Sequence, residues 1–487
     1  MHKPLIEQLE TRQLLSAVAP GTLVDLPLQP ATGENVALAP AQVQQILAQA
    51  ISQGLNKTGQ TTEVAVVVDR EGQILGTLAG NGTPSATTQI LLALAAVRAR
   101  TASNFQSDGE AFTTRTARFI VQNHFPPGIA NTEGGPLYGT QYSDLIGSDI
   151  LLASQTPGIS GDPGGVPLYT TNPATGKKVA VGAIGVAGDF HDTAATLKLL
   201  PLTQEPGYNA NPKGRVYHGQ EEVDRDEAIA QAGANGFMAP AAIRATNIFI
   251  GGLRLPFVAE PPASGKPSIA FQTLTSDGSA TEYTAAGAAV ANNTTAVIAG
   301  TPEMMNASIG GVQGLIRDRA NVVMSSVPGV PTLDANGNEI PHVDPQADGD
   351  DSSPLFDNII SSDDTGGLTQ QDVVTIIGQA VQQAEVTRAG IRKPNGINAE
   401  VHVVVVDTAG NVLGAFRMND GTNFSYDIAV QKARTAAFFS DDTHAFSTRA
   451  IGFMAQRNFP PGLGSQAEGP LFGLQNALNE SAPPLGL

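Results

Sequence analysis

The chain of 487 residues carries a formal net charge of -18, which argues against a nucleic-acid partner, because an acidic surface repels the phosphate backbone. It contains no cysteine, which excludes disulfides, thiolate metal ligands and a cysteine nucleophile. No apolar run is as long as the roughly eighteen residues that a membrane-spanning helix needs, so no transmembrane segment is expected.

The N-terminal tract, residues 5–17, is not an ordinary secretory signal, because Glu7, Glu10 and Arg12 interrupt its apolar residues. It resembles the LEPR-XLL type sequence of planctomycete surface and secreted proteins, although Thr11 stands where that pattern has proline. The resemblance implies an exported or cell-envelope protein. The alternative interpretation is a short amphipathic helix on a cytoplasmic protein.

One stretch of the sequence occurs twice. Residues 98–141 and 432–475 align without a gap and are identical at 21 of 44 positions. Upstream of each copy lies a valine-rich hairpin pattern, at residues 64–76 and 401–414. We therefore predict two copies of one domain.

In the first copy, apolar spacing predicts a helix beginning at Pro40, then a strand hairpin and two helices. A second hairpin is expected to turn near residues 174–176, and a closing helix follows it. The predicted ranges are 41–54 for the first helix, 63–69 and 73–78 for the hairpin, 90–103 and 111–123 for the helices, 164–188 for the second hairpin and 222–237 for the closing helix.

The second copy begins with a helix over residues 368–386, in which Thr369 and Asp372 form a capping-box pattern. It has no sequence like the second hairpin or the closing helix. We expect this copy to be truncated. The alternative is that it completes its sheet with something else.

These patterns divide the chain into a lead-in of residues 1–39, a first domain of 40–237, a central region of 238–367 and a partial second domain of 368–487. Within the central region, residues 243–257 and 267–275 are predicted strands. Residues 334–354 are predicted to form an exposed acidic connection. We interpret this region as a tether with partial order.

Five motifs occur in order along the chain, at residues 66–75, 98–102, 164–168, 182–188 and 226–228. Together they resemble the GlcG/HbpS family, whose domain is labelled haem-degrading or haem-binding. The resemblance implies a profilin-like α/β (α+β) domain: a mostly antiparallel sheet flanked by helices, assembled into dimers or larger oligomers. The insertion at residues 189–221 departs from the family pattern.

This resemblance implies haem or a related tetrapyrrole as cofactor, which requires an axial iron ligand and an apolar slot. His124, before the F-P-P-G loop, and His191, between Asp189 and Asp192, are candidate ligands. The second copy has Asn458 at the position of His124. The alternative interpretations are a surface or capping histidine at 124 and a polar turn at 191.

Threonine or histidine is described near the iron in the resembled family, so Thr101 and Thr435 are further candidates. Each is equally explained as a helix threonine bonding its own backbone. Matched arginines could meet the haem propionates or pair with a local carboxylate such as Asp108 or Asp442. These arginines are Arg100, Arg434, Arg115 and Arg449.

No serine-hydrolase elbow, zinc-protease motif or phosphate-binding loop occurs, and no catalytic residue or metal site is assigned. The sequence predicts a haem-binding protein, with haem degradation and redox sensing both left open. The alternatives are a non-catalytic oligomerisation or interaction module and a small-organic-acid binding protein.

Overall fold

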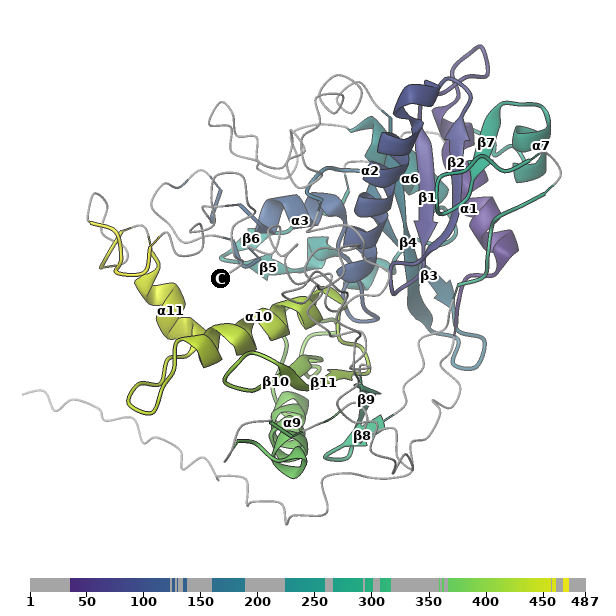
Figure 1. Cartoon of the computed structure of the whole chain (residues 1–487). Helices are drawn as coiled ribbons and strands as arrows, with labels where there is room; N and C mark the ends of the chain where they lie inside the picture. Colours follow the sequence, from purple (N-terminus) through teal and green to yellow (C-terminus); the bar gives the residue numbers. More distant parts are fainter. Residues whose placement is uncertain are drawn as a thin grey trace, which may run out of the picture.

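The computed structural model is a mixed α/β protein with antiparallel sheets flanked by helices (Figure 1). This is the fold class that the sequence predicts. The structure describes residues 36–122, 125–127, 129, 135–137, 160–188, 224–258, 266–291, 294–300, 307–316, 359, 361, 362, 367–456, 458–460 and 467–472.

The first half contains a five-stranded sheet in the order β3-β4-β1-β2-β7. All four pairings are antiparallel. The predicted hairpins form its first four strands in chain order, and β7 comes from the central region. The strands are β1 (Val64–Val68), β2 (Ile74–Gly80), β3 (Gly165–Thr171), β4 (Lys178–Ala187) and β7 (Ala280–Tyr283).

Helices cover both faces of this sheet because its central strand is apolar on both sides. Ala65 and Val67 of β1 pack with α1 (Pro40–Gly54) and α6 (Arg225–Gly233). The other three β1 residues belong to the cluster beneath α2 (Ser85–Asn104), at the left of the sheet in Figure 1. The first half is therefore a three-layered unit.

Helix α2 lies unusually close to β4 at Gly185. A Cβ built on this glycine would lie 1.9 Å from the carbonyl oxygen of Ala95, closer than any real contact. Ala95, Ala99 and Ala102 of α2 are fully buried. The glycines that the sequence places along this strand therefore allow a helix of small residues to approach it.

Arg98 of α2 ties β4 and α6 to this helix. The side chain is almost fully buried; its Nη1 donates to the carbonyl oxygen of Val186 at 2.7 Å and to Asp226 at 2.8 Å. Its Nη2 donates to Asp162 at 2.6 Å. A buried guanidinium needs such partners, because removing it from water costs several kcal/mol.

The second half contains a four-stranded sheet in the order β10-β11-β9-β8. Helix α9 begins with the predicted capping box, in which Asp372 accepts from Thr369 and Thr369 accepts from the Asp372 amide. The elements are β8 (Ala307–Ile309), β9 (Val312–Ile316), α9 (Gln370–Glu385), β10 (His402–Val406), β11 (Val412–Met418), α10 (Phe424–Phe438) and α11 (Thr448–Met454).

Matching details recur in the two halves. Nε of Arg100 donates to the Gly72 carbonyl at 2.9 Å, and Nε of Arg434 donates to the Gly410 carbonyl at 2.9 Å. Both hairpins also have a register shift before their last paired residue. The repeated sequence thus forms the same local structure twice.

Two expectations for the central region are wrong. Residues 267–275 are not a strand: α7 (Phe271–Ser276) lies there, because the three-residue spacing of Phe271 and Leu274 buries both against α1. The central region is also more than a tether, since it supplies β7 to the first sheet and β8 and β9 to the second.

Residues 243–257, also expected to be a strand, form two 3₁₀ turns and a short two-stranded ribbon instead. The turns are η4 (Ala241–Ile243) and η5 (Ala245–Asn247), and the ribbon is β5 (Phe249–Ile250) with β6 (Leu253–Arg254). This segment packs on α3 (Thr114–Ile120) through a shared apolar cluster. The acidic connection and the N-terminal tract lie outside the described residues.

Replacing Arg98 by methionine should lower the free energy of unfolding of the first half by about 3–5 kcal/mol, because Asp226 would stay buried without its cation. The matched control is Lys432→Met, at the equivalent and exposed position of α10. It should change stability by no more than about 0.5 kcal/mol. Urea unfolding followed by circular dichroism measures both. Equal losses in the two variants would contradict this account of Arg98.

Candidate functional site

The two histidines predicted as iron ligands, His124 and His191, lie outside the described residues. Their roles stay predictions. The candidate site is therefore built from the described side chains.

The matched threonines and arginines of the R-T-A motif lie beneath the surface. Thr101 is buried, and its hydroxyl accepts from the backbone N–H of Ser160 at 2.9 Å. Thr435 is also buried. Arg100 and Arg434 hold the hairpin turns through the bonds described above. Each half contains one of these threonines and one of these arginines.

The matched pair Arg115 and Arg449 differ in their surroundings. Arg115 is buried, and its Nε donates to Glu227 of α6 at 2.7 Å. Arg449 is exposed on α11, and the described residues of the second half contain no counterpart of α6. The local carboxylate predicted as one possible partner for these arginines, Asp108, instead accepts from the amide of Ala180 at 2.8 Å.

A cluster of charges joins the two halves. Arg392, in the loop between α9 and β10, donates to Glu110 at 3.3 Å and to Asp420 at 2.6 Å. Asp420 also accepts from Arg70 at 3.0 Å. Nearby, the rings of Phe105 and Phe424 lie 4.3 Å apart. These groups are largely buried, so the cluster serves as the contact between the halves.

Burial raises the pKa of Glu110 from 4.5 to about 7. Arg392 and Arg70 act in the opposite direction because their charges favour the carboxylate, and Asp420 raises the pKa further. The carboxyl of Glu400, beside the same cluster, also has its pKa raised, chiefly by burial. The contact between the halves therefore contains two carboxyl groups, those of Glu110 and Glu400, whose pKa is higher in the folded protein than in the unfolded chain.

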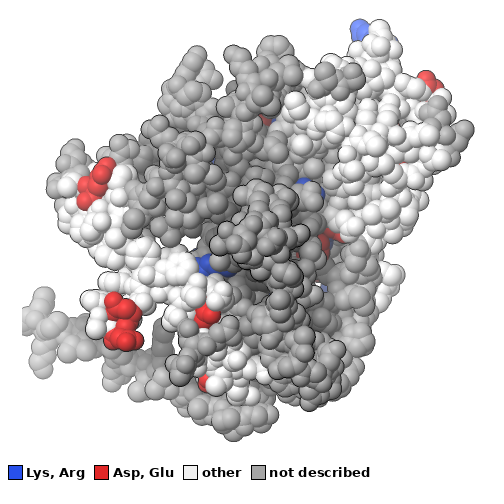
Figure 2. Space-filling view, in the orientation of Figure 1, with Lys and Arg blue, Asp and Glu red and all other residues white. Residues whose placement is uncertain are grey.

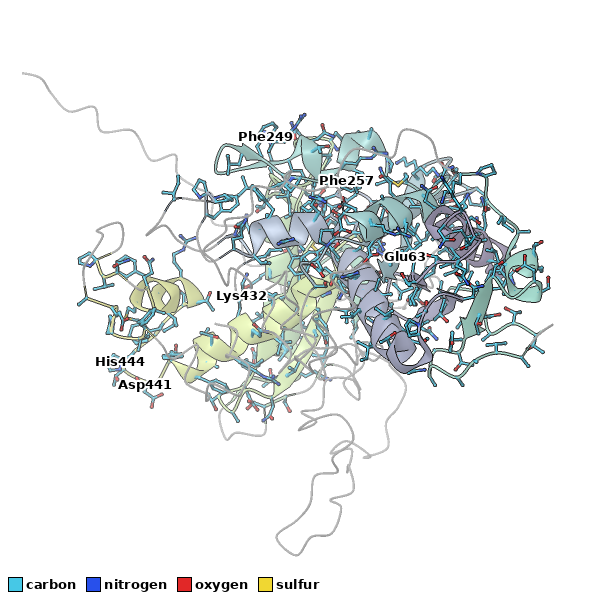
Figure 3. The ribbon with its side chains drawn as sticks, turned by 90° about the horizontal axis from the view of Figure 1, so that it is seen from above. Glu63, Phe249, Phe257, Lys432, Asp441 and His444 are labelled. Carbon is cyan, nitrogen blue, oxygen red and sulfur yellow. The ribbon has the colours of Figure 1, made fainter. Side chains whose placement is uncertain are left out.

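At the position equivalent to Glu110, the second half has His444, which is exposed in the loop between α10 and α11. We call residues 439–447 the α10–α11 corner. Nδ1 of His444 lies 3.1 Å from Oδ1 of Asp441 and 2.7 Å from Oγ1 of Thr443. Figure 3 shows His444 and Asp441 together at the outer edge of the protein, away from Lys432.

The hydrogen bonds fix the tautomer of this ring. Thr443 Oγ1 donates to Asp441 at 2.7 Å, so the threonine oxygen can only accept from Nδ1. The described ring-nitrogen contacts of His444 all go through Nδ1. With its proton on Nδ1, the ring presents the Nε2 lone pair, the usual arrangement of a metal-ligating histidine held by a carboxylate.

The carboxylate that holds this ring stays ionised. Hydrogen bonds from the Thr443 hydroxyl and backbone N–H, followed by those from the His444 imidazole and backbone N–H, lower the pKa of Asp441 to about 2. Figure 2 shows acidic side chains over the corner and basic side chains over α10. The corner therefore holds an ionised carboxylate within hydrogen-bond distance of the imidazole.

Phenylalanine residues occur within the α10–α11 corner and on both sides of it in the sequence. The ring of Phe446 stacks beside His444 at a centroid distance of 6.2 Å and an interplanar angle of 11°. Phe438, at the end of α10, and Phe453, in α11, are 60% and 51% exposed. The Phe446 ring beside the imidazole could contact a flat apolar ligand.

The sequence analysis missed His444, although a signal was present. Asp441-Asp442-Thr443-His444 departs from the repeat, whose first copy has Ser107-Asp108-Gly109-Glu110. A comparison of the residues that the two copies share does not detect a histidine that only one copy contains.

Among the described residues, no group of three or more histidine, aspartate or glutamate side chains could hold a metal ion. No helix in the same part of the chain is both long enough and apolar enough for a membrane span. A haem iron, which its macrocycle already holds, can be bound through a single histidine.

Residues 368–483 match a family model described as haem degrading protein HbpS-like. The match supports the GlcG/HbpS family for this region, and it encloses the whole α10–α11 corner. A search of curated proteins finds no match. The family match therefore lies in the second half, which the sequence analysis interpreted as a partial copy.

The free energy of unfolding should fall as pH rises from about 5 to 7, because folded Glu110 keeps its proton in this range and the unfolded carboxyl does not. Its stabilising contribution is present below pH 4.5 and is lost as pH rises through about 7. Replacing Glu110 by glutamine should reduce this fall by on the order of 2 kcal/mol, and the part due to Glu400 should remain.

Urea unfolding at several pH values measures this slope. The matched control is Glu468→Gln, which changes an exposed carboxylate of the second half and should leave the slope as it is in the unmodified protein. A slope that Glu110→Gln leaves unchanged would contradict the assignment.

Proposed function

We propose that residues 368–483 bind haem, and that the two halves of the chain are copies of one GlcG/HbpS-like domain. The observation that carries the haem proposal is the family match, which covers this region. The 21 shared positions and the repeated hairpin bonds support the duplication.

Within this region we propose His444 as the axial ligand of the iron. Its Nδ1 is held by Asp441, and a ring oriented in this way offers Nε2 to an iron atom without further ordering. His402, the other histidine of the matched region, is buried, and its Nδ1 lies 2.8 Å from the Ser425 hydroxyl. The exposed imidazole is therefore the better candidate.

Phe446 lies beside the His444 ring and nearly parallel to it, so the edge of the Phe446 ring would contact the macrocycle of a haem that His444 holds. Asp441 would strengthen the donor capacity of the imidazole, because a carboxylate partner raises ligand basicity. Bound haem would bring an iron that can change oxidation state, which is compatible with both degradation and redox sensing.

Hemin added to the full-length protein should give a shifted Soret band that saturates near one haem per chain. Replacing His444 by alanine should weaken binding at least tenfold, because the iron would lose its protein ligand. Asp441→Asn should weaken it by up to about tenfold, since the imidazole keeps its place but loses its orienting charge. Absorption titrations measure all three affinities.

His124→Ala and His191→Ala test the two ligands predicted from the sequence; if His444 is the ligand, both variants bind hemin as the unmodified protein does. Added imidazole should restore the Soret shift of His444→Ala. Retention of full affinity in His444→Ala would reject His444 as the ligand, and loss of affinity in His124→Ala or His191→Ala would transfer the role to that histidine. No Soret shift in any form would reject haem binding.

A further inference from the structure

Strand β10 ends the second sheet with one edge that pairs with no strand among the described residues. Its counterpart in the first half, β1, is a central strand that pairs with β4 along its full length, from Val64 with Ala187 to Val68 with Ala183. All five β1 residues are buried, whereas Val403, Val404 and Val406 of β10 are only half-buried. An apolar edge of this kind is a template for a further strand.

The helix above this edge keeps the surface that receives β4 in the first half. The buried alanines of α2 that face β4 have counterparts in α10 at Ala429, Ala433 and Ala436. These three are half-buried, unlike the fully buried originals. The second half therefore has small residues suited to a close strand, and no such strand among the residues that the structure describes.

The hydrogen-bonding side chains are also retained. In the first half, Thr114 accepts from the amide of Gly165 at 3.0 Å, which holds the start of β3. Thr448 stands at the same place in the second half and is half-buried. Thr435 likewise repeats Thr101, which receives Ser160. These hydroxyls match a hairpin that the described second half does not contain.

The cations that hold α6 are retained as well. Arg98 and Arg115 pair with two adjacent carboxylates of α6, Asp226 and Glu227. Their counterparts Lys432 and Arg449 are exposed. Two cations therefore remain at the places where the first half binds an acidic helix.

Helix α9 exposes an apolar surface where α1 is covered by α6. Gly233 of α6 lies against α1, where a Cβ would be 3.0 Å from Ala50 and 3.2 Å from the Ile46 carbonyl. Ile46 is fully buried, but the equivalent Ile376 of α9 is 39% exposed. The exposed Ile376 lies on a different helix from the two cations. Both observations indicate the place of a counterpart of α6, which the described residues of the second half do not contain.

We propose that the second half is a receptor that completes its sheet with a segment of another polypeptide. The segment is a β-hairpin whose glycine-bearing strand pairs with β10, followed by a helix carrying two adjacent carboxylates. The carboxylates meet Lys432 and Arg449, and an apolar face of the helix covers Ile376. The required chemistry is that of β3, β4 and α6 of this chain.

Charge favours an acidic partner over a second copy of this chain docked edge to edge. Two β10 edges could pair, but among the described residues of the second half there is no counterpart of α6 to bring two adjacent carboxylates to Lys432 and Arg449. Such a contact would also leave Ile376 uncovered. A hairpin with an acidic helix satisfies the edge, the cations and the apolar surface together.

A separately expressed fragment of residues 160–237 is the probe, because in the full-length chain the same segment already occupies the first half. The fragment should bind the full-length protein and slow hydrogen exchange at the amides of residues 402–406. Arg449→Glu should weaken binding at least tenfold. A fragment with Glu227→Arg should restore binding to Arg449→Glu, since the two charges are exchanged.

The control is Lys57→Glu, which makes the same charge change at an exposed loop of the first half and should leave binding unchanged. Failure of the fragment to bind, with unchanged exchange at β10, would overturn the proposal. A dimer of the full-length chain that protects β10 and that the fragment does not displace would favour a second copy instead.

A second form of the test does not depend on the solubility of the fragment. The same segment joined to the C-terminus of the full-length chain by a flexible glycine-serine linker is present at high effective concentration. It should protect β10 from exchange, and Arg449→Glu in the chain should remove that protection. Exchange unaffected by the fused segment would count against the receptor.

Discussion

The buried guanidinium of Arg98 is the interaction on which the first half depends. It joins α2 to β4, to α6 and to Asp162 through three short bonds, so these segments cannot separate without leaving a charge in an apolar interior. This arrangement also explains the most evident difference between the halves. The second half has the helix but, among the described residues, none of its partners, and its cation Lys432 lies at the surface.

The same repeat position serves different purposes in the two halves. Glu110 is buried at the contact between the halves, 3.3 Å from Arg392, and Arg392 comes from a loop that is longer in the second half than in the first. The equivalent His444 is exposed and held by its own loop. A symmetrical pair would bury both positions or expose both. The asymmetric contact therefore leaves one corner available for a ligand.

The periodicity of apolar residues was sufficient to predict the elements that pack against one layer, such as α1 and the two hairpins. The residue types at positions 369 and 372 were sufficient to predict the capping box of α9. Periodicity has limits, however. It failed at residues 267–275, because a short apolar run does not distinguish a strand from a single helical turn packed on α1. Partners distant in sequence, such as Arg98 with Asp226 or β7 with β2, left no local signal. His444 was missed because the repeat comparison emphasised shared residues.

The two proposed ligands approach adjacent parts of the second half. The corner that holds His444 runs from the end of α10 to the start of α11, and Arg449 is the second residue of α11. A docked segment that pairs with Arg449 therefore orders one end of the loop that presents the imidazole. If this ordering raises the affinity for haem, haem must raise the affinity for the segment by the same factor, because coupling between two binding sites is reciprocal. Completing the sheet and holding the cofactor would then be linked through a single loop.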